Sequence, residues 1–213
     1  LKPHGIRLML YLPCQTPNRD LQAVKAFGLP ETPVNGDRKI DAAFARKWAQ
    51  VVREWSERYG ESVFGWWFDG GYQWCNFNNE LAAVYAEAVK YGNPKAVVTF
   101  NPGVSLKRWT AAEDYTAGEL NEPFKHSCEG RWLDGSQWHV LTFLGKTWGK
   151  RDTRYTDEQW AGWAAAVTSK GGCLTLDLGP NYDANNGPVG SFDAQQLRQL
   201  KAIAQAARGG NAK

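Results

Sequence analysis

Asp69 is the residue in this sequence whose surroundings best suit chemistry. It follows an apolar run, Val63 to Phe68, and the two glycines after it allow the backbone to turn sharply. A carboxylate flanked by Trp67 and Phe68 is partly dehydrated. Such a group suits a nucleophile, or an ion that stabilises a cationic sugar transition state. The simpler alternative is an aspartate in a turn or a helix cap, although caps rarely follow two tryptophans and a phenylalanine.

A second carboxyl group is needed as general acid and base if this chemistry is the cleavage of a glycoside. Glu119 is the best-placed candidate, at the end of a short predicted strand, Tyr115 to Leu120. Glu122 and Glu129 lie on the loop that follows and are the alternatives. Each of the three is also explained as a solvated loop residue, so the choice stays open from the residues alone.

Further polar and aromatic residues stand where the predicted strands end. The carboxyl ends of parallel strands meet at one edge of a sheet, so we expect these side chains to converge on a polar pocket. Most tryptophans are explained equally well as core residues, and His139 as a satisfied core histidine. The expected substrate-binding residues are Tyr11, Trp67, Tyr72, Trp74, Asn101, Trp138 and His139.

The elements that must position these residues alternate between strand and helix. Strands are predicted at residues 6–12, 63–68, 96–100, 115–120, 138–144 and 173–178. Helices are predicted at residues 41–59, around 81–89, from a capping box at Thr156 to about residue 170, and at 193–207. Residues 124–137 are predicted to form a loop rich in glycine and polar side chains.

This alternation predicts an α/β fold with parallel strands joined by right-handed crossovers. An open doubly wound sheet and a (β/α)8 barrel compete, and the first strand lacks the Gly-rich phosphate loop that favours the open sheet. We therefore expect one catalytic domain over residues 1–213, of the TIM-barrel type. Only six βα units are counted where a barrel has eight. Two units are expected to precede this sequence, as an N-terminal segment or a second chain that completes the barrel.

Composition narrows the possible partners. The 213 residues include 25 Lys and Arg against 22 Asp and Glu, a net charge of +3 with the basic residues scattered. This balance predicts neither a nucleic-acid partner nor a membrane partner. The four cysteines form no CxxC pair, which argues against a zinc knuckle, and the residues at the strand ends have no metal-ligand spacing. We expect neither a metal site nor a cofactor. The 11 tryptophans supply flat apolar faces of the kind that stack on sugar rings.

Two segments carry a resemblance to a known family. Trp67-Phe68-Asp69-Gly70, and the run Gly171-Gly172-Cys173-Leu174-Thr175-Leu176-Asp177-Leu178-Gly179-Pro180, resemble the α-L-fucosidases of glycoside hydrolase family 29. The resemblance spans the whole chain as barrel strands three to eight. It implies a retaining exo-glycosidase with Asp69 as nucleophile and an acid/base carboxylate from a later loop.

Three departures from the family pattern matter. Trp138-His139 stands where some members have Trp-Glu with that Glu as acid/base, so the resemblance passes the role to Glu119, whose segment is similar to a T-P-E stretch of relatives. Asn101-Pro102 stands where the family often has a pocket arginine. The family's first two strands and its C-terminal β-sandwich have no counterpart in this sequence.

We therefore expect an α-L-fucosidase-like hydrolase that removes terminal fucose from oligosaccharides or glycoconjugates. The alternatives are a non-catalytic carbohydrate-binding relative and a glycosidase for a different terminal sugar. A secreted or periplasmic location is favoured, although the cysteine pattern leaves the redox compartment open.

Overall fold

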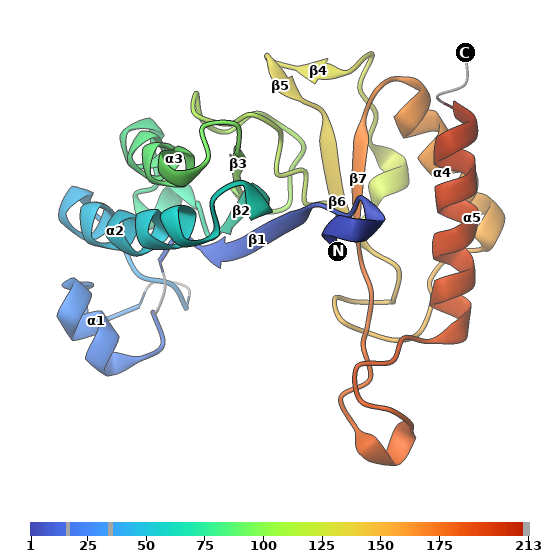
Figure 1. Ribbon diagram of the computed structural model, residues 1–213, viewed down its shortest axis with the longest axis horizontal. Helices are drawn as coiled ribbons and strands as arrows, with labels where there is room; N and C mark the ends of the chain where they lie inside the picture. The colour runs from blue at the N-terminus through green and yellow to red at the C-terminus, as the bar shows by residue number, and fades with distance from the viewer. Residues whose placement is uncertain (16–17, 34–35, 211–213) are drawn as a thin grey trace. The chain divides into compact units, whose positions relative to one another are not determined.

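The computed structural model describes residues 1–15, 18–33 and 36–210 (Figure 1). The chain divides into two compact units, residues Leu1–Ala117 and Gly118–Lys213, and each is described by itself. Both units combine helices with parallel strands, which confirms the predicted α/β class. Within the described residues, no helix has both the length and the apolar character that a membrane span requires.

The first unit is built on a parallel sheet in the order β1-β2-β3. Its strands are β1 (Leu8–Pro13), β2 (Val63–Asp69) and β3 (Val97–Phe100). Its helices are α1 (Leu21–Phe27), α2 (Ala42–Tyr59) and α3 (Asn79–Gly92), with short 3-10 turns at Lys2–His4, Gly60–Ser62 and Gln73–Cys75.

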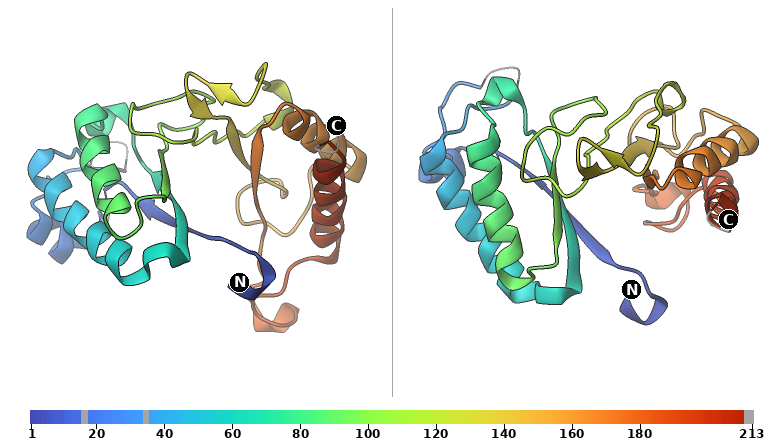
Figure 2. Two further views of the ribbon diagram at one scale, coloured as in Figure 1. Left: turned by 45° about the horizontal axis from the view of Figure 1, so that its top comes forward. Right: turned by 90° about the horizontal axis from the view of Figure 1, so that it is seen from above.

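Helices α2 and α3 lie side by side and cover one face of this sheet (Figure 2). Successive side chains of a strand point to opposite faces, so Trp66 and Phe68 of β2 point toward the helices. There they join a buried cluster that includes Phe44 of α2, Tyr85 of α3 and Phe100 of β3. Burial of these large apolar side chains is the main force that holds the helices on the sheet.

The opposite face of the sheet carries the residues of chemical interest. Trp67 and Asp69 alternate with the core residues of β2, and the strand register pairs Tyr11 of β1 with Trp67. Gly65 lies on the same face, where an added Cβ would come within 2.9 Å of Met9 and Val97 side-chain atoms. The absence of a side chain at Gly65 therefore lets the Met9 and Val97 side chains pack closely, next to the pair formed by Tyr11 and Trp67.

The second unit contains two small sheets. Strands β4 (Trp132–Leu133) and β5 (Ser136–Gln137) form an antiparallel hairpin, and β6 (His139–Phe143) pairs in parallel with β7 (Cys173–Asp177). Helices α4 (Asp157–Ser169) and α5 (Ala194–Gly210) pack against each other, and 3-10 turns occur at Pro123–Lys125 and Ala184–Asn186. The capping box predicted at Thr156 is present at the start of α4.

The structure corrects three details of the sequence prediction. Residues 115–120 form no continuous strand: Gly118 turns the backbone with φ +60°, and the segment carries isolated bridge residues, among them Glu119, which pairs with Leu141. The predicted loop at residues 124–137 contains the hairpin of β4 and β5. Helix α1 was not predicted, because its seven residues bury only Val24 and show no clear period. The sheets in the described residues are small and do not close into a barrel.

Candidate active site

Asp69 ends β2 with both carboxylate oxygens engaged. Its Oδ1 accepts hydrogen bonds from Asn101 Nδ2 at 2.9 Å and from the Gly70 amide at 2.8 Å. Its Oδ2 accepts a hydrogen bond from the Tyr11 hydroxyl. Gly70 has φ +74°, a conformation that favours glycine, and it turns the chain directly after the carboxylate. The side chain is half-buried and held in one orientation by three donors from separate segments.

Asn101 is fully buried and follows β3 on the same face as Asp69. Its Oδ1 accepts a hydrogen bond from the Gly103 amide at 3.1 Å, which fixes the side chain with its Nδ2 toward Asp69. Glu113 holds the backbone next to Asn101 in place. Its carboxylate accepts hydrogen bonds from the Phe100 amide at 3.1 Å and from the Trp109 amide at 2.7 Å. Burial raises the pKa of Glu113 to about 7.

Two stacked aromatic pairs lie beside Asp69. Tyr11 and Trp67 stack with ring centroids 5.2 Å apart, and Tyr72 stacks on Trp74 at 4.2 Å. Tyr11 and Trp74 present the outer faces, with exposed fractions of 60% and 43%. Trp67 is buried beneath Tyr11, so its expected role as a sugar contact passes to the ring that covers it.

Glu119 lies in the second unit, where the backbone on both sides of it pairs with β6. The Leu120 amide donates to the Leu141 carbonyl, and the Leu141 amide donates to the Gly118 carbonyl, both at 2.9 Å. This pairing holds Glu119 half-buried at a defined place. Glu122, in contrast, is exposed and paired with Lys125 at 2.7 Å. The hydrogen bond from Lys125 lowers the pKa of Glu122, which makes it a poorer proton donor than an unpaired glutamate.

The remaining predicted residues of the second unit differ in burial. His139 is buried and its Nε2 lies 2.8 Å from the Thr175 hydroxyl, so it is partnered within the unit. Trp138 is 1% exposed and packs on Gly172, so it is a core side chain rather than an aromatic on an open loop. Glu129 is exposed on the loop before β4.

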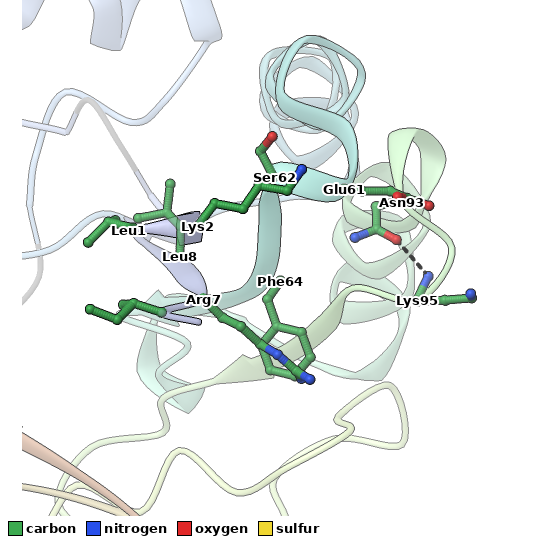
Figure 3. A pocket seen from close by; sticks show the side chains of 10 residues that line it. Leu1, Lys2, Arg7, Leu8, Glu61, Ser62, Phe64, Asn93 and Lys95 are labelled. Carbon is green, nitrogen blue, oxygen red and sulfur yellow. Dashed lines mark hydrogen bonds between the residues drawn. The ribbon is translucent and has the colours of Figure 1, made fainter. Parts of the chain in front are cut away.

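A cavity of about 530 Å³ in the first unit lies away from this chemistry. It is lined by residues at the starts of the three strands, among them Arg7, Leu8 and Phe64 (Figure 3). The Arg7 guanidinium lies over the Phe64 ring, 4.4 Å from its centroid. Asp69 is at the other end of β2, where parallel α/β folds place their active sites.

Sequence reasoning missed one acidic residue near Asp69. Asp37 lies on the long connection between β1 and α2, and it lines the same small cavity as Asp69. The sequence prediction selected residues at the ends of strands, and Asp37 follows no strand, so it was not selected. Burial is the main cause that raises the pKa of Asp37, and the negative charge of Asp69 raises it further.

In the described part of the chain, no three or more His, Cys, Asp or Glu side chains are grouped closely enough to hold a metal ion. That neither a metal nor a cofactor takes part stays a prediction. The arrangement around Asp69 offers a fixed carboxylate, an amide and a phenol as hydrogen-bond donors, and two exposed aromatic faces.

The Alpha-L-fucosidase family model matches residues 2–207 of the chain. No curated protein matches it in sequence. Solved structures with a similar fold include an endo-fucoidan hydrolase of glycoside hydrolase family 107, MfFcnA4, with a TM-score of 0.70 and 17% identity over 95% of this chain and 39% of that chain.

Two α-L-fucosidase structures are also similar. Isoenzyme 1 from Paenibacillus thiaminolyticus has a TM-score of 0.58 and 17% identity, covering 100% of this chain and 50% of that one. AlfC from Lactobacillus casei, in complex with its α-L-fucose product, has a TM-score of 0.62 and 14% identity, covering 98% and 62%. At these identities the likeness is one of fold. The chain spans about two fifths of the length of MfFcnA4.

Proposed function

Because this chain belongs to the α-L-fucosidase family, we propose that it is a retaining glycoside hydrolase that removes terminal α-L-fucose from oligosaccharides or glycoconjugates. The observation that carries the proposal is the restraint on Asp69 by Tyr11, Asn101 and the Gly70 amide. A nucleophile must meet the anomeric carbon in one geometry, and a carboxylate held by three donors is already in place.

The proposed reaction is a double displacement. Asp69 attacks the anomeric carbon and forms a glycosyl ester while the bond to the leaving oxygen breaks. Glu119 donates a proton to that oxygen, then takes one from the water that hydrolyses the ester and releases Asp69. The role of Asp69 rests on its motif and its geometry, and that of Glu119 on its sequence context and its fixed position beside β6.

The aromatic pairs suit the non-reacting parts of the substrate. A sugar presents C–H groups on one ring face, and the exposed faces of Tyr11 and Trp74 are apolar surfaces of matching size. Tyr11 then has two functions, because its hydroxyl restrains Asp69 while its ring faces outward. We propose that both rings contact the sugars on either side of the scissile bond.

The direct test removes the nucleophile and replaces it chemically. Asp69→Ala is expected to lower the turnover of an aryl α-L-fucoside by ~1,000-fold or more. Added azide should restore turnover and give the β-fucosyl azide, because it attacks from the vacated side. Asp41→Ser is the matched control, since Asp41 caps α2 and serine preserves the cap. Unchanged activity in Asp69→Ala would exclude the proposed nucleophile.

The acid/base role is tested with leaving groups of different acidity. Glu119→Ala should retain much of its first-step rate on a dinitrophenyl fucoside, which needs no proton, and lose it on a natural disaccharide. Glu129→Ala, on an exposed loop residue, is the comparison. If Glu129→Ala shows the leaving-group pattern and Glu119→Ala does not, the acid/base assignment moves to Glu129.

We also propose that the βα units of this chain form part of a (β/α)8 barrel. The support is the parallel order of β1, β2 and β3 with helices on one face, together with the fold likeness to larger glycosidase structures. An added N-terminal segment or a second chain would supply further strands. Sedimentation measurements with and without such a segment distinguish the two, because association with a second copy of this chain doubles the mass and a covalently attached segment does not.

The same assays separate the alternatives. Saturable fucose binding without any hydrolysis identifies a binding protein. Turnover of aryl glycosides of another sugar, but not of aryl fucosides, identifies a glycosidase for a different terminal sugar. Hydrolysis of terminal α-L-fucosides by the wild type, lost in Asp69→Ala, supports the proposed function over both.

A further inference from the structure

A small polar cavity adjoins Asp69 in the first unit. It has a volume of about 70 Å³ and is lined by Pro13, Gln15, Asn18, Asp37, Asp69, Gly70 and Tyr72. At about 30 Å³ for a water molecule, this space is too small for a sugar ring and large enough for a hydroxyl group with its nearest atoms. Two of its walls are carboxylates, so it is suited to a hydrogen-bond donor.

The cavity is built by contacts that tie the β1–α2 connection to the end of β2. Gln15 is 1% exposed, and its Nε2 donates to the Gly70 carbonyl at 2.8 Å while its Oε1 accepts from the Arg38 amide at 2.9 Å. Because Arg38 follows Asp37 directly, this bridge fixes Asp37 relative to Gly70. The Cys14 amide also donates to the Asp69 carbonyl at 2.6 Å.

Arg38 secures the other side of the cavity. Its side chain is buried, donates from Nε to the Asn18 carbonyl at 2.9 Å, and donates from Nη1 to the Pro30 and Glu31 carbonyls. Asp37 Oδ1 accepts a long hydrogen bond from Asn18 Nδ2, at 3.4 Å. Among the described residues, Asp37 Oδ2 has no hydrogen-bonding partner, so the cavity has an acceptor to offer.

We propose that Asp37 is a specificity-determining residue that accepts a hydrogen bond from the sugar hydroxyl next to the anomeric carbon. The inference rests on the proposed function, which places the anomeric carbon at the Asp69 carboxylate. The substituent closest to that carbon on the ring is the 2-hydroxyl, and the cavity that shares Asp69 as a wall is where it fits. A hydrogen bond to the 2-hydroxyl strengthens as the sugar ring gains positive charge in the transition state. Asp37 therefore raises the rate of hydrolysis and favours sugars that carry this hydroxyl.

The test pairs a variant with a substrate that lacks the hydroxyl. Asp37→Asn is assayed on 4-nitrophenyl α-L-fucoside and on its 2-deoxy analogue. On the parent substrate kcat/KM is expected to fall by about 10-fold or more, and on the deoxy analogue by less than about 2-fold, because the lost interaction is already absent there. Equal losses on both substrates would overturn the proposal.

Glu31→Gln is the matched control, because it removes one negative charge from the same connection at an exposed side chain outside the cavity. It should behave as the wild type on both substrates. Asn18→Ala is a second variant and should show the pattern of Asp37→Asn in weaker form. Melting temperatures of all variants establish that each is folded at the assay temperature.

Measurements of sugar binding to the wild-type protein test the role of Asp37 independently of the proposed hydrolysis. Free L-fucose is expected to bind at least about 10-fold more tightly than 2-deoxy-L-fucose, measured by calorimetry. Equal affinities would overturn the role of Asp37 even if hydrolysis is observed. Absence of hydrolysis on every fucoside, with the binding preference intact, would overturn the proposed function and leave the assignment of Asp37 standing.

Discussion

Tyr11 and Asp69 lie on neighbouring parallel strands, two positions apart in the register, and the Tyr11 hydroxyl donates a hydrogen bond to Asp69 Oδ2. The register places Tyr11 beside Trp67, and the long tyrosine side chain spans the step from that residue to the end of the strand. The stack on Trp67 holds the ring in the orientation that this hydrogen bond needs. Strand pairing therefore aligns the carboxylate before any substrate binds.

The first prediction concerns this contact. Tyr11→Phe removes the hydroxyl and keeps the ring on Trp67, so the fold should be unchanged. A hydrogen bond to a charged group contributes about 1.5–3 kcal/mol, so kcat/KM on an aryl fucoside should fall by about 10- to 100-fold. Tyr91→Phe, at a half-exposed ring that packs on Arg53, is the control. An active Tyr11→Phe enzyme would mean that Asn101 and Gly70 suffice to orient Asp69.

The second prediction concerns Asn101, whose replacement should lower both stability and activity. Asn101→Ala removes the donor to Asp69 Oδ1 and leaves the half-buried Gly103 amide without this acceptor. We expect the unfolding free energy to fall by about 1–3 kcal/mol, together with a loss of turnover. Urea denaturation and kcat measured on the same samples check both. A variant that loses activity at full stability would show that the Gly103 contact contributes little.

The strand ends of the first unit were predictable from the sequence. An apolar run that stops at a polar residue marks both the strand and its exit, so Asp69 and Asn101 could be placed at one edge before any coordinates. The Tyr11 hydrogen bond could not, because it depends on the register of β1 against β2. The two strands are joined by a long connection that contains α1 and α2, so no turn between them fixes which residues pair.

Side-chain burial is where the residue patterns fail. Trp138 and Trp74 look alike in the sequence, yet one is buried and the other is 43% exposed. The difference is made by Gly172, which brings its backbone against the Trp138 ring.

Asp37 was not predicted for a related reason. Its place beside Asp69 is set by Gln15 and Arg38, whose contacts connect segments far apart in the chain.

A third prediction follows from Glu113. Its pKa is raised to about 7 from an ordinary value of 4.5, so between these pH values the folded protein retains a proton that the unfolded chain releases. The unfolding free energy should therefore fall as the pH rises from 4.5 to 7, by up to about 3 kcal/mol from this group. Glu113→Gln does not titrate and should show a shallower fall. Glu87→Gln, on an exposed residue of α3, should keep the wild-type slope, as measured by chemical denaturation across this range.

The last prediction concerns the glycine that positions Glu119. Gly118 has φ +60°, and a Cβ there would lie 2.0 Å from the His139 carbonyl oxygen. Gly118→Ala must therefore push the segment away from β6, with an expected cost of about 2–4 kcal/mol in unfolding free energy. Because the Leu120 and Leu141 backbones then lose their pairing, Glu119 shifts as well, and turnover should fall even at a temperature where the variant is folded.

Gly130→Ala is the control, since nothing lies within 4 Å of the added methyl group and the backbone there is unstrained. Wild-type melting behaviour in Gly118→Ala would show that this bridge does not hold Glu119 in place.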